Sequence, residues 1–174
     1  MNYNPSIAER GLAGENALNL WFQQQGLPYV SICQNPATFS TLFPENVKRP
    51  DFLLLIPALG TIAIDAKNYT LSRGVFTLEY EAELRRSVAF ERLFRIPVWY
   101  AYMDHSNGGQ CWYWISALRA VEVGEVRFNS ARGVQFLAIP VEEFARVCVA
   151  NDLAQLYHQN LLSVANVYGL PPNF

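Results

Sequence analysis

Two strand-like segments joined by a short turn constrain the fold of this chain most strongly. Residues 52–56 (FLLLI) form a continuous apolar run, and residues 61–66 again favour extended structure. Between them, residues 57–60 contain a proline and a glycine, which are typical of turns. The sequence therefore predicts a β-hairpin at residues 52–66, with polar residues at the open end of both strands.

The length of the turn decides which polar residues face each other. With three turn residues, Asp51 lies opposite Asp65, whereas with two it lies opposite Ala66. Side chains alternate along a strand, so Asp65 and Lys67 share one face in either register. The two isoleucines of the strand then point to the other face.

Helices and strands are expected to surround this hairpin. We expect one helix from Pro5 to Gln25, ended by Gly26, and a second from Glu79 to Phe94. The other expected elements are strands at 29–32, 96–103 and 111–115, a hairpin at 125–128 and 134–139, and one or two helices within 141–164. Because a helix precedes it, the strand at 96–103 is expected to join the earlier sheet through a crossover.

Composition favours a compact protein without membrane spans. The chain has 174 residues, 51% of them hydrophobic, which is enough for one domain with a buried core. No apolar run approaches the roughly 18 residues of a membrane helix, and the first residues do not resemble a signal peptide. We expect a cytoplasmic protein without a membrane partner. Cys33, Cys111 and Cys148 lack metal-site spacing and are expected to be reduced.

The charge balance limits any role in nucleic-acid binding. The formal net charge is −2, which argues against a large basic surface for phosphate contacts. Only two of the thirteen Lys and Arg residues are lysines, and the arginines could form a local patch. A nucleic-acid partner would therefore have to be bound locally.

Scarce residue types gather around the predicted hairpin. The chain has four aspartates and two lysines, and Asp51, Asp65 and Lys67 all lie at the hairpin ends. Two carboxylates could share a Mg²⁺ ion, and a lysine beside it could orient or deprotonate an attacking water. Glu15 interrupts the apolar stripe that contains Leu12 and Leu18 in the first helix, so it could add a fourth group. This set predicts metal-dependent cleavage of phosphodiesters.

The order of these residues resembles the PD-(D/E)XK nuclease superfamily. The motifs are a helical Glu15, then Pro50-Asp51, then Asp65-Ala66-Lys67, followed by a helix and an apolar strand. Over residues 6–103 the layout is most similar to Holliday junction resolvases and related endonucleases. The resemblance implies an α/β fold with a restriction-endonuclease-like αβββαβ core, in which helices flank a mixed central sheet. We expect a single domain over 1–174, with this core at about 5–116 and an extra hairpin and helix region at about 117–174.

The resemblance also implies roles for individual residues. Glu15, Asp51 and Asp65 would surround Mg²⁺, with Mn²⁺ as a substitute, and the Ala66 carbonyl would be a further ligand. Lys67 would be the catalytic lysine. The implied activity is a Mg²⁺-dependent DNA endonuclease, acting on branched, recombination or mobile-element DNA. Further DNA contacts are expected from Tyr69, Arg73, Arg85 and Arg86, although a solvated surface role fits these four equally well.

Several structural alternatives stay open at this point. Glu15 could pair with a buried arginine, Asp51 could be only a turn or strand-start residue, and Asp65 and Lys67 could form a surface pair on an edge strand. The whole chain could instead be an inactive nuclease-fold protein that serves as a binding or assembly module. Cleavage of both DNA strands would favour a homodimer by symmetry, and a protein partner that supplies DNA binding would fit the acidic charge.

Overall fold

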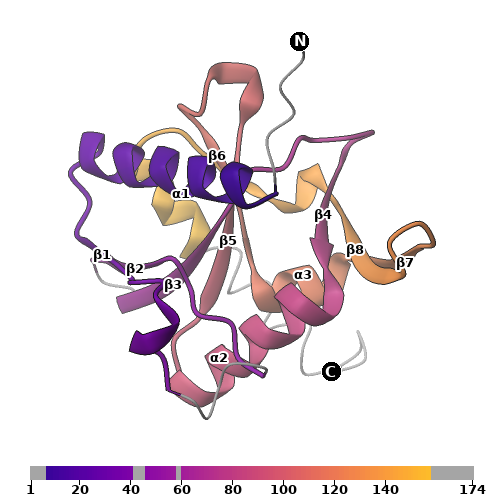
Figure 1. Ribbon diagram of the computed structural model, residues 1–174. Helices are drawn as coiled ribbons and strands as arrows, with labels where there is room; N and C mark the ends of the chain where they lie inside the picture. The colour runs from indigo at the N-terminus through magenta and orange to yellow at the C-terminus, as the bar shows by residue number, and fades with distance from the viewer. Residues whose placement is uncertain (1–6, 41–45, 58–59, 158–174) are drawn as a thin grey trace, which may run out of the picture.

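The computed structural model describes residues 7–40, 46–57 and 60–157, and this part has an α/β fold with two sheets. The main sheet is mixed, with the strand order β1-β2-β3-β5-β6-β9 (Figure 1). Its strands are β1 (Tyr29–Ser31), β2 (Phe52–Ile56), β3 (Gly60–Lys67), β5 (Val98–Met103), β6 (Trp112–Ser116) and β9 (Ala145–Val147). A smaller antiparallel sheet consists of β4 (Val75–Glu79), β8 (Val134–Pro140) and β7 (Glu125–Asn129).

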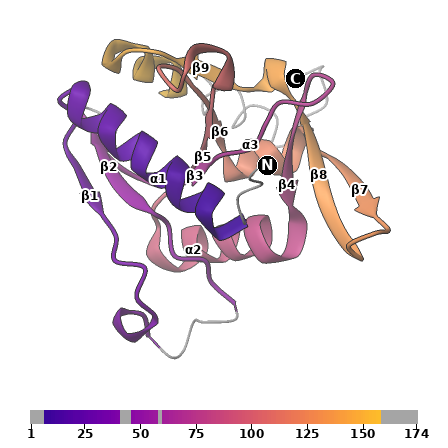
Figure 2. The same ribbon diagram turned by 45° about the horizontal axis from the view of Figure 1, so that its top comes forward.

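Helices cover both faces of the main sheet. The longest, α1 (Ile7–Gln24), crosses one face, while α2 (Arg86–Phe94), α3 (Ala117–Val123) and the smaller sheet lie on the other (Figures 1 and 2). A π-helical segment, Tyr80–Arg85, leads directly into α2. Short 3₁₀ turns occur at Pro36–Thr38, His105–Asn107, Val141–Glu143 and Ala150–Leu153. Among the described residues, no helix has the length and apolar character needed to cross a membrane.

The two faces of the main sheet belong to two hydrophobic cores. On the α1 side, Leu18, Trp21 and Phe22 pack with Ile64 and Trp99, among others. On the other side, residues of the main sheet pack with the second helical region and the smaller sheet, including Ala63, Tyr100, Leu84, Phe90, Phe76 and Leu137. Successive residues of β3 thus enter different cores, as the strand period requires.

The register of the β2–β3 hairpin matches the three-residue turn. Ile56 pairs with Gly60 and Phe52 pairs with Ile64, which places Asp51 and Asp65 next along the two strands. The two-residue turn is therefore wrong. Because β3 lies between β2 and β5, the edge-strand interpretation of Asp65 and Lys67 is also wrong.

The strand at 96–103 joins the sheet as expected. Its observed form, β5, runs parallel to β3 and is antiparallel to β6. The parallel pairing follows from the helical crossover through α2. The expected hairpin at 125–128 and 134–139 is confirmed as β7 and β8, although it belongs to the smaller sheet.

The apolar stripe of α1 runs through Gly14 rather than Leu12. Leu12 is 58% exposed, whereas Gly14, Leu18 and Phe22 are buried. At Gly14 the helix approaches β3 so closely that a Cβ atom there would lie 2.8 Å from the Cβ of Asn68. The expectation for Leu12 was wrong because this close approach turns the neighbouring helix face toward solvent.

Two strands were not expected from the sequence. Residues 75–79 form β4, so the predicted helix from Glu79 begins one residue later, in its π-helical part. Within the stretch expected to be helical at 141–164, Ala145–Val147 form β9 on the edge of the main sheet beside β6. Residues 158–164 lie outside the described part of the chain. The region after 116 is thus partly integrated into the main sheet.

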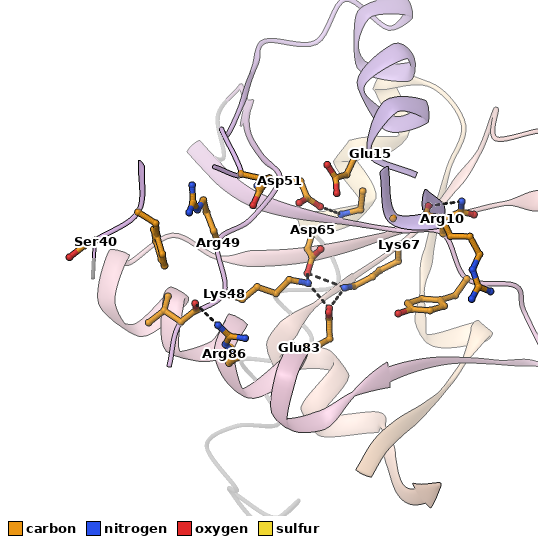
Figure 3. Close-up of a pocket in the computed structure, with 17 residues that line it drawn as sticks. Arg10, Glu15, Ser40, Lys48, Arg49, Asp51, Asp65, Lys67, Glu83 and Arg86 are labelled. Atoms are coloured by element: carbon orange, nitrogen blue, oxygen red, sulfur yellow. Dashed lines mark hydrogen bonds and ion pairs between the residues drawn. The ribbon is translucent and has the colours of Figure 1, made fainter. Parts of the chain in front are cut away.

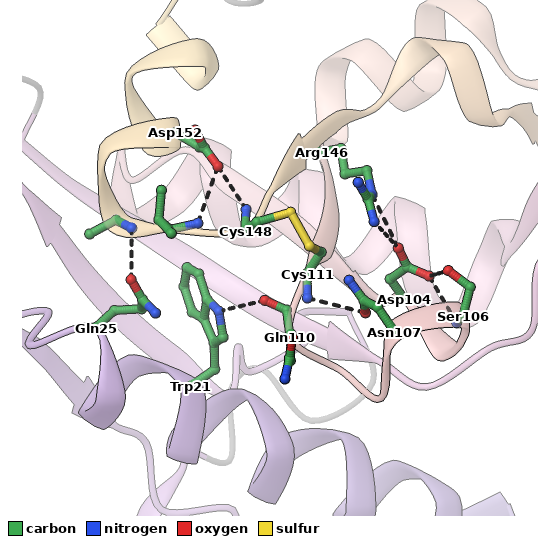
Figure 4. The surroundings of a disulfide bond; sticks show 12 residues. Trp21, Gln25, Asp104, Ser106, Asn107, Gln110, Cys111, Arg146, Cys148 and Asp152 are labelled. Carbon is green, nitrogen blue, oxygen red and sulfur yellow. Dashed lines mark hydrogen bonds and ion pairs between the residues drawn. A yellow bond between two sulfur atoms is a disulfide. The ribbon is translucent and has the colours of Figure 1, made fainter.

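The expectation of three reduced cysteines was also wrong. Cys111 and Cys148 form a disulfide between the start of β6 and the end of β9, with Cα atoms 4.1 Å apart (Figure 4). Pairing of Trp112 with Val147 brings the two cysteines opposite each other, across 37 residues of sequence. Cys33 is free and exposed. Disulfides are rare in a reducing cytosol, so this bond gives no support to the expected cytoplasmic location. That location stays a prediction.

Candidate functional site

A cavity of about 750 Å³ opens where α1, the start of β2, the end of β3 and the segment before α2 meet. All four residues of the predicted site line it: Glu15, Asp51, Asp65 and Lys67. Figure 3 shows the carboxylate of Asp65 near its centre, with Glu15 and Asp51 on one side and the lysine cluster on the other. The structure thus brings together residues that are up to 52 positions apart in sequence.

Asp51 and Asp65 are held beside each other by the hairpin backbone. Asp51 is 9% exposed and Asp65 is 3% exposed. The Oδ2 atom of Asp51 accepts a hydrogen bond of 2.8 Å from the backbone N–H of Ala66. Asp51, which directly precedes β2, therefore links the two strands of the hairpin through its side chain.

Asp65 also belongs to a compact cluster of charged side chains. Its Oδ2 atom lies 2.5 Å from Nζ of Lys48 and 3.2 Å from Nζ of Lys67. Glu83, from the π-helical segment, accepts from the same two ammonium groups, and its distance to Lys48 is 2.5 Å. Lys67 is only 5% exposed, so this pairing compensates a charge that lies almost out of contact with water.

Glu15 reaches the cavity from α1. It is half-buried, and the ion pairs found among the described residues do not include it. The alternative of a buried arginine partner is therefore wrong for this part of the chain. One residue before Glu15, Gly14 lies against Asn68, which directly follows β3, so α1 passes close to the end of the strand that carries Asp65.

The closeness of Glu15, Asp51 and Asp65, together with burial, raises the proton affinity of the first two. Burial raises the pKa of Asp51 to about 8, and the negative charges of Asp65 and Glu15 add to this rise. Burial, followed by the charge of Asp65, also raises the pKa of Glu15. Burial alone would do the same to Asp65, but the charges of Lys48 and Lys67 outweigh it and lower its pKa.

The two lysines are shifted in opposite directions. Burial lowers the pKa of Lys67 to about 7, and the positive charge of Lys48 contributes to the lowering while Asp65 opposes it. Burial would also lower the pKa of Lys48, but the charge and hydrogen bond of Asp65 raise it above its ordinary value. Near neutral pH, Lys67 is thus the lysine that can take up or release a proton.

The donors in the cavity fit a hard divalent cation. The described residues that line the cavity include carboxylates but no histidine or cysteine, which is the chemistry of a Mg²⁺ site rather than a zinc site. Within the described residues, no three acidic, His or Cys side chains are yet grouped closely enough to ligate an ion. The mutual repulsion of Asp51, Asp65 and Glu15 would nevertheless favour binding of a cation between them.

The four expected DNA contacts divide into two groups. Tyr69 and Arg86 line the cavity. Arg85 lies outside it, with a side chain that is 72% exposed and paired with Glu81 at 2.8 Å. Arg73 is an exposed residue of the turn before β4 and also lies away from the cavity. The structure therefore places only the first pair near the carboxylates.

Sequence reasoning missed Lys48, Glu83, Arg10 and Arg49, which all line the cavity. Lys48 carried a readable signal, because it is one of only two lysines and lies three residues before Asp51. Glu83 had no such signal, since its direction depends on the π-helical geometry of Tyr80–Arg85. The three basic residues among them, with Lys67 and Arg86, give an acidic protein a local group of five basic side chains.

Comparisons with known proteins leave the family undecided. No family model matches the chain, and no curated protein or solved structure matches it either. The geometry of the cavity is therefore the main indication of what this protein does.

Proposed function

We propose that this protein is a Mg²⁺-dependent DNA endonuclease of the PD-(D/E)XK type. One observation carries the proposal: Glu15, Asp51, Asp65 and Lys67 come from three separate segments and line one cavity. Carboxylates that can hold a metal ion and a lysine of lowered pKa that can accept a proton are suited to metal-dependent hydrolysis of a phosphodiester.

The order of the elements supports a restriction-endonuclease-like core. Helix α1 is followed by β1, β2 and β3, then by α2 and β5, with β5 parallel to β3. This is the αβββαβ arrangement, with β4 inserted before the second helix. Asp65 lies on β3 and Asp51 directly precedes the neighbouring β2, so the paired backbone of the hairpin fixes the separation of these two carboxylates.

Each side chain has a role that follows from its position. Asp51, Asp65 and Glu15, with the Ala66 carbonyl, would hold Mg²⁺ or Mn²⁺, and the ion would stabilise negative charge on the phosphate. Lys67 would orient the attacking water and accept its proton, since its pKa lies near neutral pH. The arginines at the cavity would draw in a DNA strand despite the acidic overall charge.

A second candidate function is an inactive nuclease-fold binding module. It is favoured by one observation: Asp65 is already neutralised by Lys48 and Lys67, so the cluster is balanced by the chain's own ammonium groups. Calorimetric titration with Mg²⁺ separates the two functions. Saturable binding that is lost in Asp65→Asn supports the nuclease, whereas no heat of binding supports the module.

The activity is tested with labelled duplex, flap, four-way junction and single-stranded DNA, each incubated with Mg²⁺ or with EDTA. We expect Mg²⁺-dependent cutting of at least one of these substrates. The same panel should be run after addition of candidate partner proteins, because a partner could supply part of the DNA surface. Cutting that persists in EDTA would contradict the proposed mechanism.

A further inference from the structure

Both lysines of the chain lie in the same cavity. Nζ of Lys48 is 2.5 Å from Oδ2 of Asp65, and Nζ of Lys67 is 3.2 Å from the same atom. Both ammonium groups also contact Glu83. A nuclease of the proposed type needs one lysine at the attacking water, so the second lysine at the same carboxylate needs its own explanation.

The two lysines differ in their access to solvent. The side chain of Lys67 is 6% exposed, whereas that of Lys48 is 22% exposed. Figure 3 shows them reaching Asp65 from opposite sides, Lys67 from the end of β3 and Lys48 from the segment before β2. Lys67 is thus enclosed beside the carboxylates, and Lys48 is the one that an incoming strand can reach.

Lys48 is fixed in place by its surroundings. Its backbone N–H donates to the carbonyl of Arg86 at 3.1 Å, and its neighbour Val47 is 2% exposed. On the other side of the cluster, Glu83 is presented by a π-helical turn, a rare geometry that is frequent at functional sites. This ammonium group is therefore held by buried backbone and two carboxylates, unlike a solvated surface lysine.

We propose that Lys48 binds the phosphate next to the bond that is cut, while Lys67 serves the attacking water. This inference rests on the proposed function. As a strand enters, the Lys48 ammonium would exchange its contact with Asp65 for a non-bridging phosphate oxygen, leaving the Asp65 carboxylate available to the cation. Glu83 is the positioning residue that keeps both ammonium groups at the site during this exchange.

A salt titration of DNA binding tests this assignment without any cutting. Labelled duplex DNA is bound in EDTA at several NaCl concentrations, and binding is followed by fluorescence anisotropy. Loss of one phosphate contact should weaken binding and make the slope of log K against log salt shallower by about 0.9. We expect weaker binding and a shallower slope for Lys48→Ala and also for Lys48→Gln, which keeps a longer but uncharged side chain. The charge-preserving Lys48→Arg should restore the slope, and Lys67→Ala should leave it unchanged.

Arg92→Ala is the control, because Arg92 is an exposed residue of α2 outside the cavity. It should keep the wild-type slope. Folding of each variant is checked by thermal unfolding, and Lys48→Gln replaces Lys48→Ala if the latter does not fold. In Mg²⁺, Lys48→Gln should raise KM, and Glu83→Gln should lower kcat.

The outcomes separate this inference from the proposed function. A wild-type slope in Lys48→Gln overturns the phosphate contact even if the wild-type protein cuts DNA. Equal loss of slope in Lys48→Gln and Lys67→Ala also overturns it, because the two lysines would then share one role. A protein that shows the Lys48-dependent slope but never cuts DNA supports the contact and overturns the nuclease.

Discussion

The carboxylate of Asp51 accepts a 2.8 Å hydrogen bond from the backbone N–H of Ala66, across the β2–β3 hairpin. Ala66 directly follows Asp65, so this bond holds the two aspartates side by side at the cavity. The carboxyl groups of Asp51, Asp65 and Glu15 approach each other there, so ionising all three is unfavourable in the protein alone and becomes favourable once a cation binds. These carboxyl groups are therefore expected to affect both the stability of the protein and the proposed activity.

Asp51→Asn should stabilise the protein at alkaline pH in EDTA. The pKa of Asp51 in the folded state is about 8, whereas an unfolded aspartate has a pKa of about 3.9. Between these values the folded state binds the extra proton, so the stability contributed by Asp51 falls as pH rises. Asparagine can still accept from Ala66 but carries no charge. In thermal unfolding, the stability of the variant relative to the wild type should increase as the pH rises from about 4 to about 8. A difference that does not change with pH would contradict this account.

Lys67→Ala should lower kcat by about 10²–10⁴-fold, the usual contribution of a general base. Lys67→Arg should fail to restore it, because a guanidinium stays protonated at neutral pH. Single-turnover cleavage of a labelled substrate measures the rate, with Arg92→Ala as the control on the neighbouring helix. Full cleavage by Lys67→Ala would remove this residue from the mechanism.

Gly14→Val should weaken both folding and activity. The added side chain would meet Asn68, since even a Cβ atom would lie 2.8 Å from the Cβ of that residue. Helix α1 would then have to move away from β3 and carry Glu15 with it. The matched control is Gly11→Ala, where a Cβ meets nothing within 4 Å. In this control the free energy of unfolding should increase by up to about 1 kcal/mol, because alanine has a higher helix propensity than glycine. Equal thermal stability of the two variants would contradict the close contact.

Reduction of the Cys111–Cys148 disulfide should lower stability and leave the site intact. The bond closes a 37-residue separation on β6 and β9, away from the cavity. Nearby, Trp21 Nε1 donates to the Gln110 carbonyl at 3.0 Å, which links this region to α1 (Figure 4). We expect dithiothreitol to reduce the free energy of unfolding by about 2–4 kcal/mol. The double variant Cys111→Ser and Cys148→Ser should not respond to dithiothreitol, whereas Cys33→Ser should respond fully. An unchanged wild-type unfolding curve in dithiothreitol would refute this prediction.

Local sequence patterns predicted the parts of the fold that depend on near neighbours. The apolar runs on either side of residues 57–60 predicted the β2–β3 hairpin but left two registers open, and the structure has the one with the three-residue turn. The period of two correctly placed Asp65 and Lys67 on one face. The alternating burial of Phe76 and Leu78 in β4 was also readable, but the expected helix was placed directly after it. Strand β4 was therefore missed, because residues 75–78 were left unassigned between a loop and the expected helix.

Long-range pairing explains most of what the sequence did not reveal. Strand β9 has three residues and is defined only by its partner β6, which is also what brings Cys111 and Cys148 together. Lys48 donates a hydrogen bond to Glu83, 35 positions away in sequence, while it also pairs with Asp65. Such contacts depend on how elements pack, so no local period could have indicated them.

The most direct test of the central claim compares DNA cleavage by the wild type, Asp65→Asn and Asp104→Asn. Asp104 is a matched control because it is also a buried aspartate, 4% exposed, and pairs with Arg146 away from the cavity. With Mg²⁺, we predict cleavage by the wild type and by folded Asp104→Asn. Asp65→Asn should lose more than about 100-fold in rate, since losing even an outer-shell partner of a metal site lowers activity by about 10–100-fold. Cleavage by Asp65→Asn at the wild-type rate would contradict the assignment of this cavity as a nuclease site.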